Sequence, residues 1–145
     1  MVLCTVIGVQ MGEKAFGAAA ADAEVWLTLR AEHEKDLELL RETVWRTAKD
    51  LAGADGLGVG MEEQDIFPAT ENDPGCAAKV MERCNGKPLE VSMRWSEDFG
   101  HYLKKCKGAF FGIGAGKDHP ALHTITYEYP DDLLEKTAEA FWNLI

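Results

Sequence analysis

A β-branched apolar run, a segment of period two and a segment of helical period follow one another in the first part of the chain. Residues 2–9 are rich in Val, Ile, Thr and Leu, and residues 24–30 alternate apolar with polar side chains, so both predict β-strands. The small residues at 12–23 predict a hairpin-like connection. From 32 to 52 the apolar positions recur with helical spacing, and Gly53 is typical of a helix end. The stripe expected to face inward consists of Leu37, Leu40, Val44, Ala48 and Leu51.

The middle of the chain continues with weaker patterns. Residues 59–67 predict a third strand, although two glutamates dilute its apolar character. Residues 75–84 predict a helix, with Pro74 favoured at its first position and Asn72 or Asp73 as its cap. Strand, strand, helix and strand in this order predict a small open α/β layer before that helix.

The stretch from residue 94 to residue 126 reads as a capped helix, a buried strand and a glycine-rich loop. Ser96 is typical of a helix cap, and the two acidic residues after it suit the positive end of a helix dipole. Gly108 is expected to end this helix, and the apolar residues 109–113 predict a buried strand.

Two further elements complete the prediction. Residues 89–93 predict a short strand, and residues 131–144 predict a last amphipathic helix with an acidic start. The side chains of this helix expected to face the core are Leu133, Leu134, Thr137, Phe141 and Leu144.

Composition restricts the class of protein. The chain has 145 residues, 46% of them hydrophobic and 28% charged, which is ordinary for one globular domain or two small ones. A net charge of −10 argues against a nucleic-acid binder, which would need a basic face. No segment reads as a membrane span or a secretory signal, so a cytoplasmic protein is expected. The four cysteines lack metal-finger spacing and predict free, mostly buried thiols.

Several ordered motifs in the C-terminal half resemble one known family. They are Ser96-Glu97-Asp98-Phe99, Gly108-Ala109-Phe110-Phe111, Gly114-Ala115-Gly116 and Leu122-His123. Their order is similar to the C-terminal end of the catalytic domain in the aminoacylase/carboxypeptidase family of metallopeptidases, most closely its amidohydrolase branch of hippurate and auxin-conjugate hydrolases.

The resemblance implies an α/β (α+β) fold in two parts. Residues 1–67 would be a partial lid or dimerisation domain of βαββαβ type, and residues 68–145 the C-terminal part of a zinc-peptidase-like catalytic domain. One departure is that Phe16-Gly17-Ala18-Ala19 stands where relatives commonly carry an Asn-Val-Ile-Pro turn. This leaves any substrate contact of that asparagine in question. A homodimer through the lid-like segment is the expected assembly.

The resemblance also implies roles for individual residues. His123 would be a ligand in a two-metal centre of zinc or manganese, which activates water for attack on an amide. From spacing alone, a lone histidine bonded to a loop carbonyl is the commoner case. Gly114, Ala115 and Gly116 would offer backbone N–H groups to a substrate carboxylate or an oxyanion, and Arg30 would bind a substrate carboxylate. The structural alternatives are a tight turn for residues 114–116 and a solvated side chain for Arg30.

Much of the family's active site has no counterpart in this sequence. Glu97, Asp98 and Asn72 are expected to border the active site without being catalytic residues. The His-x-Cys-Gly-His-Asp-type segment and the catalytic Glu-Glu pair are missing; Glu62-Glu63 lies on the predicted lid and does not replace that pair. We therefore expect the chain alone to bind no metal tightly and to leave N-acyl amino acids intact. The open alternatives are a dimerising remnant or interaction module, and an unrelated small enzyme built on Asp98 and His101.

Overall fold

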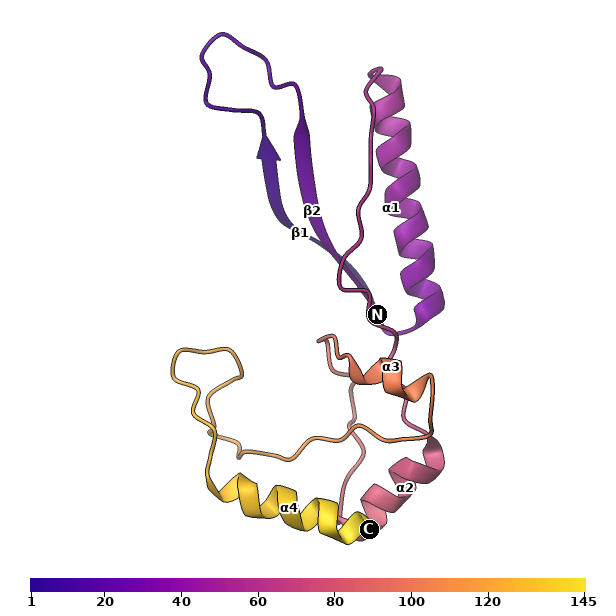
Figure 1. Ribbon diagram of the computed structural model, residues 1–145, viewed down its shortest axis with the longest axis vertical. Coiled ribbons are helices and arrows are strands. Elements are labelled where there is room, and N and C mark those ends of the chain that lie inside the picture. The colour runs from indigo at the N-terminus through magenta and orange to yellow at the C-terminus, as the bar shows by residue number, and fades with distance from the viewer. The chain divides into compact units, whose positions relative to one another are not determined.

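The structure is a computed structural model that describes all 145 residues, and the chain divides into two compact units. Unit 1 consists of Met1–Ala69 with Ser92–Trp95, and unit 2 of Thr70–Val91 with Ser96–Ile145. A two-stranded antiparallel sheet and four helices confirm the predicted α+β class (Figure 1). The assignment of one part as a lid and the other as part of a catalytic domain stays a prediction.

Unit 1 is built on a hairpin. Strands β1 (Val2–Met11) and β2 (Ala23–Ala31) pair in antiparallel fashion from Val2 opposite Ala31 to Met11 opposite Ala23. Both predicted strands and the connection between them are confirmed. The period-two pattern explains the result, because it gives the hairpin one mainly apolar face that a helix can cover.

A bulge interrupts the hairpin at Ile7. Val6 lies opposite Leu27, but the next pair is Gly8 opposite Trp26, so Ile7 has no partner of its own. Glycine is required at position 8, because a Cβ there would lie 2.4 Å from Cε3 of the Trp26 ring. The bulge adds one residue to β1. Each β1 side chain beyond it therefore points to the face opposite to the one that strict alternation from Val6 would give it.

Helix α1 (Glu34–Ala54) packs against both strands of unit 1. Of its predicted stripe, Leu37, Leu40, Val44 and Ala48 are half-buried. Leu51 was predicted to face inward but is 66% exposed, because it lies in the last turns of the helix, where the hairpin gives little cover.

The predicted third strand at residues 59–67 is wrong. This segment has no regular structure, and the sheet contains only β1 and β2. Glu63 instead lies beside α1, with its carboxylate 3.3 Å from the guanidinium of Arg41. One of the two glutamates that diluted the pattern thus forms an ion pair with the helix, and the other, Glu62, accepts a hydrogen bond from Gln64.

A short segment beyond the second helix belongs to unit 1 because of polar contacts. The Ser92 hydroxyl donates to Glu32 Oε1 at 2.7 Å, and Arg30 Nη1 donates to the Arg94 carbonyl at 3.1 Å. The short strand predicted at residues 89–93 is absent. These side-chain bonds hold the segment without the backbone ladder that a strand needs.

Unit 2 contains helices α2 (Pro74–Arg83), α3 (Phe99–Leu103) and α4 (Asp132–Leu144). The predicted start of α2 is confirmed, since Asp73 accepts a hydrogen bond from Cys76 N at 3.0 Å and Pro74 occupies the first turn. Helices α2 and α4 pack on each other, and the Cys84 thiol donates to the Ala140 carbonyl at 3.4 Å.

Two other expectations for unit 2 are wrong. Helix α3 has five residues and follows Asp98, whose side chain makes no capping bond, so Ser96 is not its cap. Residues 109–113 form no paired strand, although Ala109, Phe111 and Ile113 are half-buried as an apolar run should be. A strand requires a neighbouring backbone to bond with, and unit 2 offers none.

Little of the chain is fully buried. Leu133, at 5% exposure, is the one buried apolar side chain, whereas Leu134 and Phe141 of the same predicted core face are exposed. The expectation of mostly buried thiols is wrong as well, since Cys4 and Cys106 are exposed and the other two are half-buried. None of the four helices combines the length and apolar character of a membrane span.

Candidate functional site

The side-chain amide of Asn72 holds the extended segment after α3. Its Nδ2 donates to the Phe110 carbonyl at 2.9 Å, and its Oδ1 accepts from Phe110 N at 2.7 Å. The neighbouring Asp73 N donates to the Gly108 carbonyl at 2.9 Å. We call the two Asn72–Phe110 bonds the Asn72 clamp; they copy the paired N–H and C=O contacts of two antiparallel strands. The clamp fixes the start of the apolar run beside α2.

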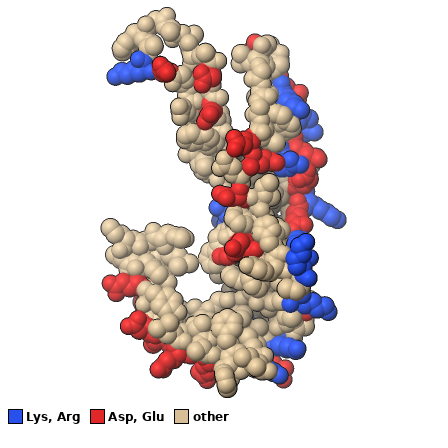
Figure 2. Space-filling model, viewed as in Figure 1, with Lys and Arg blue, Asp and Glu red and all other residues tan.

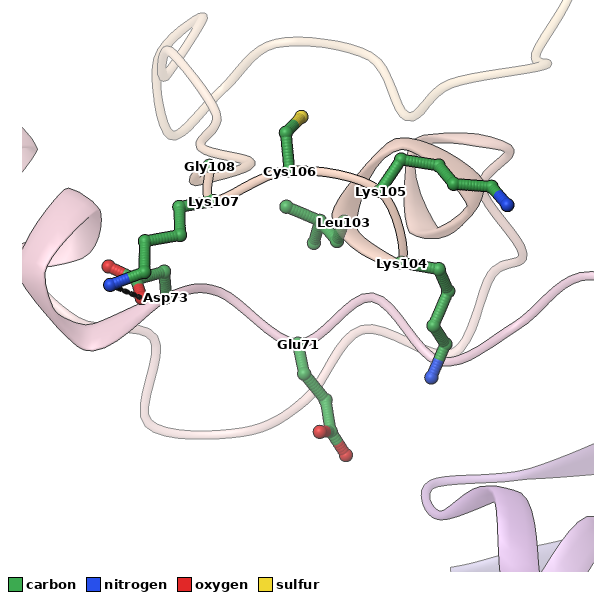
Figure 3. A pocket seen from close by; sticks show the side chains of 8 residues that line it. All are labelled: Glu71, Asp73, Leu103, Lys104, Lys105, Cys106, Lys107 and Gly108. Atoms are coloured by element: carbon green, nitrogen blue, oxygen red, sulfur yellow. Dashed lines mark ion pairs between the residues drawn. The ribbon is translucent and has the colours of Figure 1, made fainter.

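A small hollow of about 410 Å³ lies beside the clamp, between Asp73 and the basic end of α3. The Cys76 backbone N–H holds the pKa of Asp73 below its usual range, with Lys107 Nζ 3.8 Å from the carboxylate as a weaker cause. In Figure 3, the ammonium groups of Lys104, Lys105 and Lys107 point in three different directions. They do not converge on one point, so this hollow lacks the geometry of an anion site.

The larger concave surface of unit 2 is apolar and has a volume of about 660 Å³. Rings gather along it: Phe99 lies 5.3 Å from Phe110, and Phe111 lies 5.8 Å from Phe141, measured between centroids. We call this surface the aromatic hollow. Its lining comprises Phe99, Ala109, Phe110, Phe111, Ile113, Ala115, Gly116, His119, Pro120, Leu122, Tyr127, Tyr129, Leu133, Thr137 and Phe141.

His119, which lines the aromatic hollow, and His123, which does not, have different surroundings. His119 Nδ1 lies 2.9 Å from the Pro120 carbonyl, its Nε2 lies 2.8 Å from the Glu128 carbonyl, and its ring meets Tyr127 edge-on. His119 therefore holds a loop together. His123 is exposed, its ring makes no hydrogen bond, and its backbone is left-handed with φ 65°. Its imidazole nitrogens remain available to an external ligand.

The glycine-rich loop reaches the same hollow. Ala115 and Gly116 line it, and Gly116 has a φ of 115°, which strongly favours glycine. A Cβ added at Gly114 or Gly116 would meet no atom within 4 Å, so both faces of the loop are open. No hydrogen bond engages the backbone N–H groups from Gly114 to Gly116. The loop could donate these N–H groups to an anionic group.

The other expected site residues do not line the aromatic hollow. Asp98 directly precedes α3, where its carbonyl accepts from His101 N at 2.9 Å, and Glu97 before it is half-buried. Arg30 stands on β2 in unit 1, where it binds the Arg94 carbonyl. Within unit 2 the structure brings the loop and the segment around His123 to one side of the aromatic hollow, with Asn72 at the other end of the apolar run.

The metal expectation can be compared with the residues present. No group of three or more His, Cys, Asp or Glu side chains is positioned to hold a metal ion. His123 alone does not make such a site, which needs several ligands. We therefore derive no metal-dependent step for this chain by itself.

Two features of the structure were not predicted from the sequence. The first is the structural role of Asn72, which was considered only as a helix cap and a site neighbour. The second is the aromatic hollow, whose rings come from residues 99–141 and show no single period. The signal available was the unusual concentration of Phe and Tyr in that range.

An α+β chain with a glycine-rich loop followed by an unengaged histidine fits an amidohydrolase-like relationship. The chain is similar to the hippurate hydrolase of Campylobacter jejuni, with 26% identity over 147 aligned positions that cover 95% of this chain. It spans only 38% of the length of that enzyme. No family model matches the chain, and no solved structure does.

Proposed function

We propose that this chain carries the lid segment and the His123 side of the active site of a metal-dependent amidohydrolase acting on N-acyl amino acids. The observation that carries the proposal is the similarity to hippurate hydrolase along nearly the whole chain. Since the chain corresponds to less than half of that enzyme, the activity belongs to the complete parent. The isolated chain is inactive in this proposal.

His123 would supply one ligand to the zinc or manganese centre. Its exposure and its unengaged ring support this role, in contrast to His119, whose two nitrogens already face carbonyl oxygens. When bound, the metal would supply activated water and polarise the amide. The remaining ligands and the general base would come from sequence that this chain does not contain.

The substrate would be held by two groups of this chain. The free N–H groups from Gly114 to Gly116 would bind its carboxylate or the developing oxyanion, and Arg30 would offer a guanidinium to a carboxylate. Glu97, Asp98 and Asn72 would border the site. The Asn72 clamp supports the last of these placements, because it fixes the backbone that leads into the loop.

Unit 1 would serve as the lid and as the dimer contact. Each strand of its hairpin has one unpaired edge, and Val6 and Met11 of β1 are 61% and 70% exposed. Such an edge and face favour pairing with a second copy. The same observation supports the second candidate function, a non-catalytic dimerising module.

A chimera tests the catalytic proposal. The matched segment of the Campylobacter jejuni enzyme would be replaced by this chain, and hydrolysis of hippurate and of a series of N-acyl amino acids measured with zinc or manganese. We expect turnover by the chimera and a loss of at least 100-fold in the His123→Ala chimera, with His33→Ala as the matched control. A folded chimera without turnover on any substrate would favour the dimerising module, whereas an active His123→Ala chimera would refute the ligand role of His123.

A further inference from the structure

The chain exposes far more surface than its mass requires. Its accessible surface is 12274 Å² for a mass of 16.0 kDa. Two separate folded units of half that mass would expose about 8,900 Å² together, and one folded domain about 7,400 Å². At least about 3,400 Å² of surface that folding normally covers is therefore open.

A well-defined part of this open surface lies in unit 2. Residues 107–116 run on without a turn, a helix or a paired strand. The Asn72 clamp occupies the backbone groups of Phe110, whereas no hydrogen bond engages the backbone of Phe111, Gly112 or Ile113. Backbone groups of successive residues in an extended chain point to opposite edges, so the edge of Phe111 and Ile113 is the free one.

The side chains of the same segment line the aromatic hollow. Phe111 and Ile113 are half-buried on it, and Phe141 of α4 stands beside Phe111 but remains 56% exposed. An unpaired backbone edge next to an uncovered apolar surface is the arrangement that accepts an added β-strand. The backbone would supply the hydrogen bonds, and the rings would supply the apolar contact.

We propose that residues 109–113 accept a β-strand from a polypeptide equivalent to the part of hippurate hydrolase outside the match, and that this polypeptide covers the aromatic hollow. The inference rests on the proposed function for the identity of that polypeptide. The match leaves more than half of the relative without a counterpart in this chain, which is enough material to cover a surface of this size. The added strand has apolar side chains toward the hollow.

Other occupants fit the observations less well. The open surface of the whole chain greatly exceeds the roughly 800 Å² that each partner buries in a standard interface, so such a partner would leave most of it open, and a small ligand would cover less still. A second copy pairing through its own segment meets a charge conflict. Residues 108–116 carry no charge, but Lys107 and Lys117 flank them, so an antiparallel pair centred on Gly112 sets lysine opposite lysine.

Amide exchange tests the proposal in the free chain and in a mixture. The probe is the Campylobacter jejuni enzyme lacking its matched segment, added at increasing concentration to this chain. In the free chain we expect the amides of Phe111 and Ile113 to exchange at close to the intrinsic rate. In the mixture we expect a one-to-one complex by sedimentation and at least tenfold slower exchange of both amides.

Two substitutions separate the hollow from the rest of the surface. Ile113→Lys should abolish the complex, whereas Trp142→Lys, at a 78% exposed position of α4 that does not line the hollow, should leave it intact. Circular dichroism checks that each variant keeps its helices. If Ile113→Lys loses them, Phe111→Lys is used in its place. Loss with either lysine in the hollow supports the proposal.

Three results would overturn it: protected Phe111 and Ile113 amides in a monomeric free chain, absence of a complex, or a complex that Ile113→Lys and Phe111→Lys leave intact. If the free chain self-associates and these variants prevent it, the partner of this surface is a second copy of the chain. The hippurate hydrolysis of the chimera is a separate readout. An inactive chimera together with a complex would refute the catalytic proposal alone, and an active chimera without a complex would refute this one alone.

Discussion

The Asn72 clamp gives the sharpest prediction for the isolated chain. Asn72→Ala removes both the donor and the acceptor that hold Phe110. Asn72→Asp removes only the donor, but it sets a carboxylate oxygen against the Phe110 carbonyl. Both changes leave the neighbouring bond from Asp73 N to the Gly108 carbonyl in place.

The size of the effect follows from the two bonds. A hydrogen bond contributes about 0.5–1.5 kcal/mol net, so two contribute about 1–3 kcal/mol. Asn72 is exposed, and water replaces part of each bond, so we expect about 1–2 kcal/mol for Asn72→Ala. This corresponds to roughly 5- to 30-fold faster exchange of the Phe110 amide. For Asn72→Asp we expect at least the same loss of stability at pH 7.

Acidification separates the two variants. A protonated carboxyl can again donate to the Phe110 carbonyl, so the repulsion raises the folded-state pKa of the introduced group above its unfolded value. The recovered stability is present below the unfolded-state pKa of about 3.9 and is lost as the pH rises through the folded-state pKa. Asn72→Asp should therefore approach the wild type at low pH, while Asn72→Ala should not.

The assay is amide exchange followed by NMR, with rates corrected for the intrinsic dependence on pH. Asn143→Ala is the matched control, because this exposed asparagine makes no side-chain hydrogen bond. Unchanged exchange at Phe110 in both Asn72 variants would refute the clamp. An equal change in the Asn143→Ala control would show that the effect is not local.

Substitutions at three other positions test separate features. Gly8→Ala should destabilise unit 1 by about 1–3 kcal/mol in urea unfolding, because the new Cβ meets the Trp26 ring; an unchanged midpoint would contradict this packing. Since Cys76 N–H lowers the pKa of Asp73, its stabilisation is present above the unfolded-state pKa and lost as the pH falls through the folded-state pKa. Asp73→Asn, which keeps a capping oxygen, should lessen the fall in Tm on acidification; an unchanged acid profile would contradict this. His123→Val should cost about 1–2 kcal/mol at its left-handed φ, whereas His123→Asn should be tolerated; equal stabilities would contradict the strain.

Elements determined by local pattern could be predicted from the sequence. The alternation in β1 and β2, the helical stripe of α1 and the Asp73-Pro74 start of α2 each act over a few neighbouring residues. The bulge at Ile7 could not be predicted, because it depends on how Trp26 lies across Gly8 on the opposite strand.

Three predicted strands are absent because no second strand pairs with them. Residues 59–67, 89–93 and 109–113 all have apolar patterns, yet none forms a ladder in this chain. An apolar run indicates a preference for burial and extension, but a strand exists only when a second strand satisfies its N–H and C=O groups. The first segment meets α1 through Glu63, and the second meets Glu32, just after β2, through Ser92, whereas the third keeps its free edge.

The candidate site shows the same division between local and distant causes. His119 and His123 are four residues apart in one loop, and their sequence context alone does not say which ring is engaged. The engaged ring is that of His119, because the Glu128 carbonyl, nine residues further along the chain, lies 2.8 Å from its Nε2. Because the His119 ring lies between two carbonyl oxygens, a substitution there should loosen the loop, whereas His123→Asn, which tolerates the left-handed backbone, should alter only what the loop can bind. The two histidines thus separate a defect of structure from a defect of ligand binding within one segment.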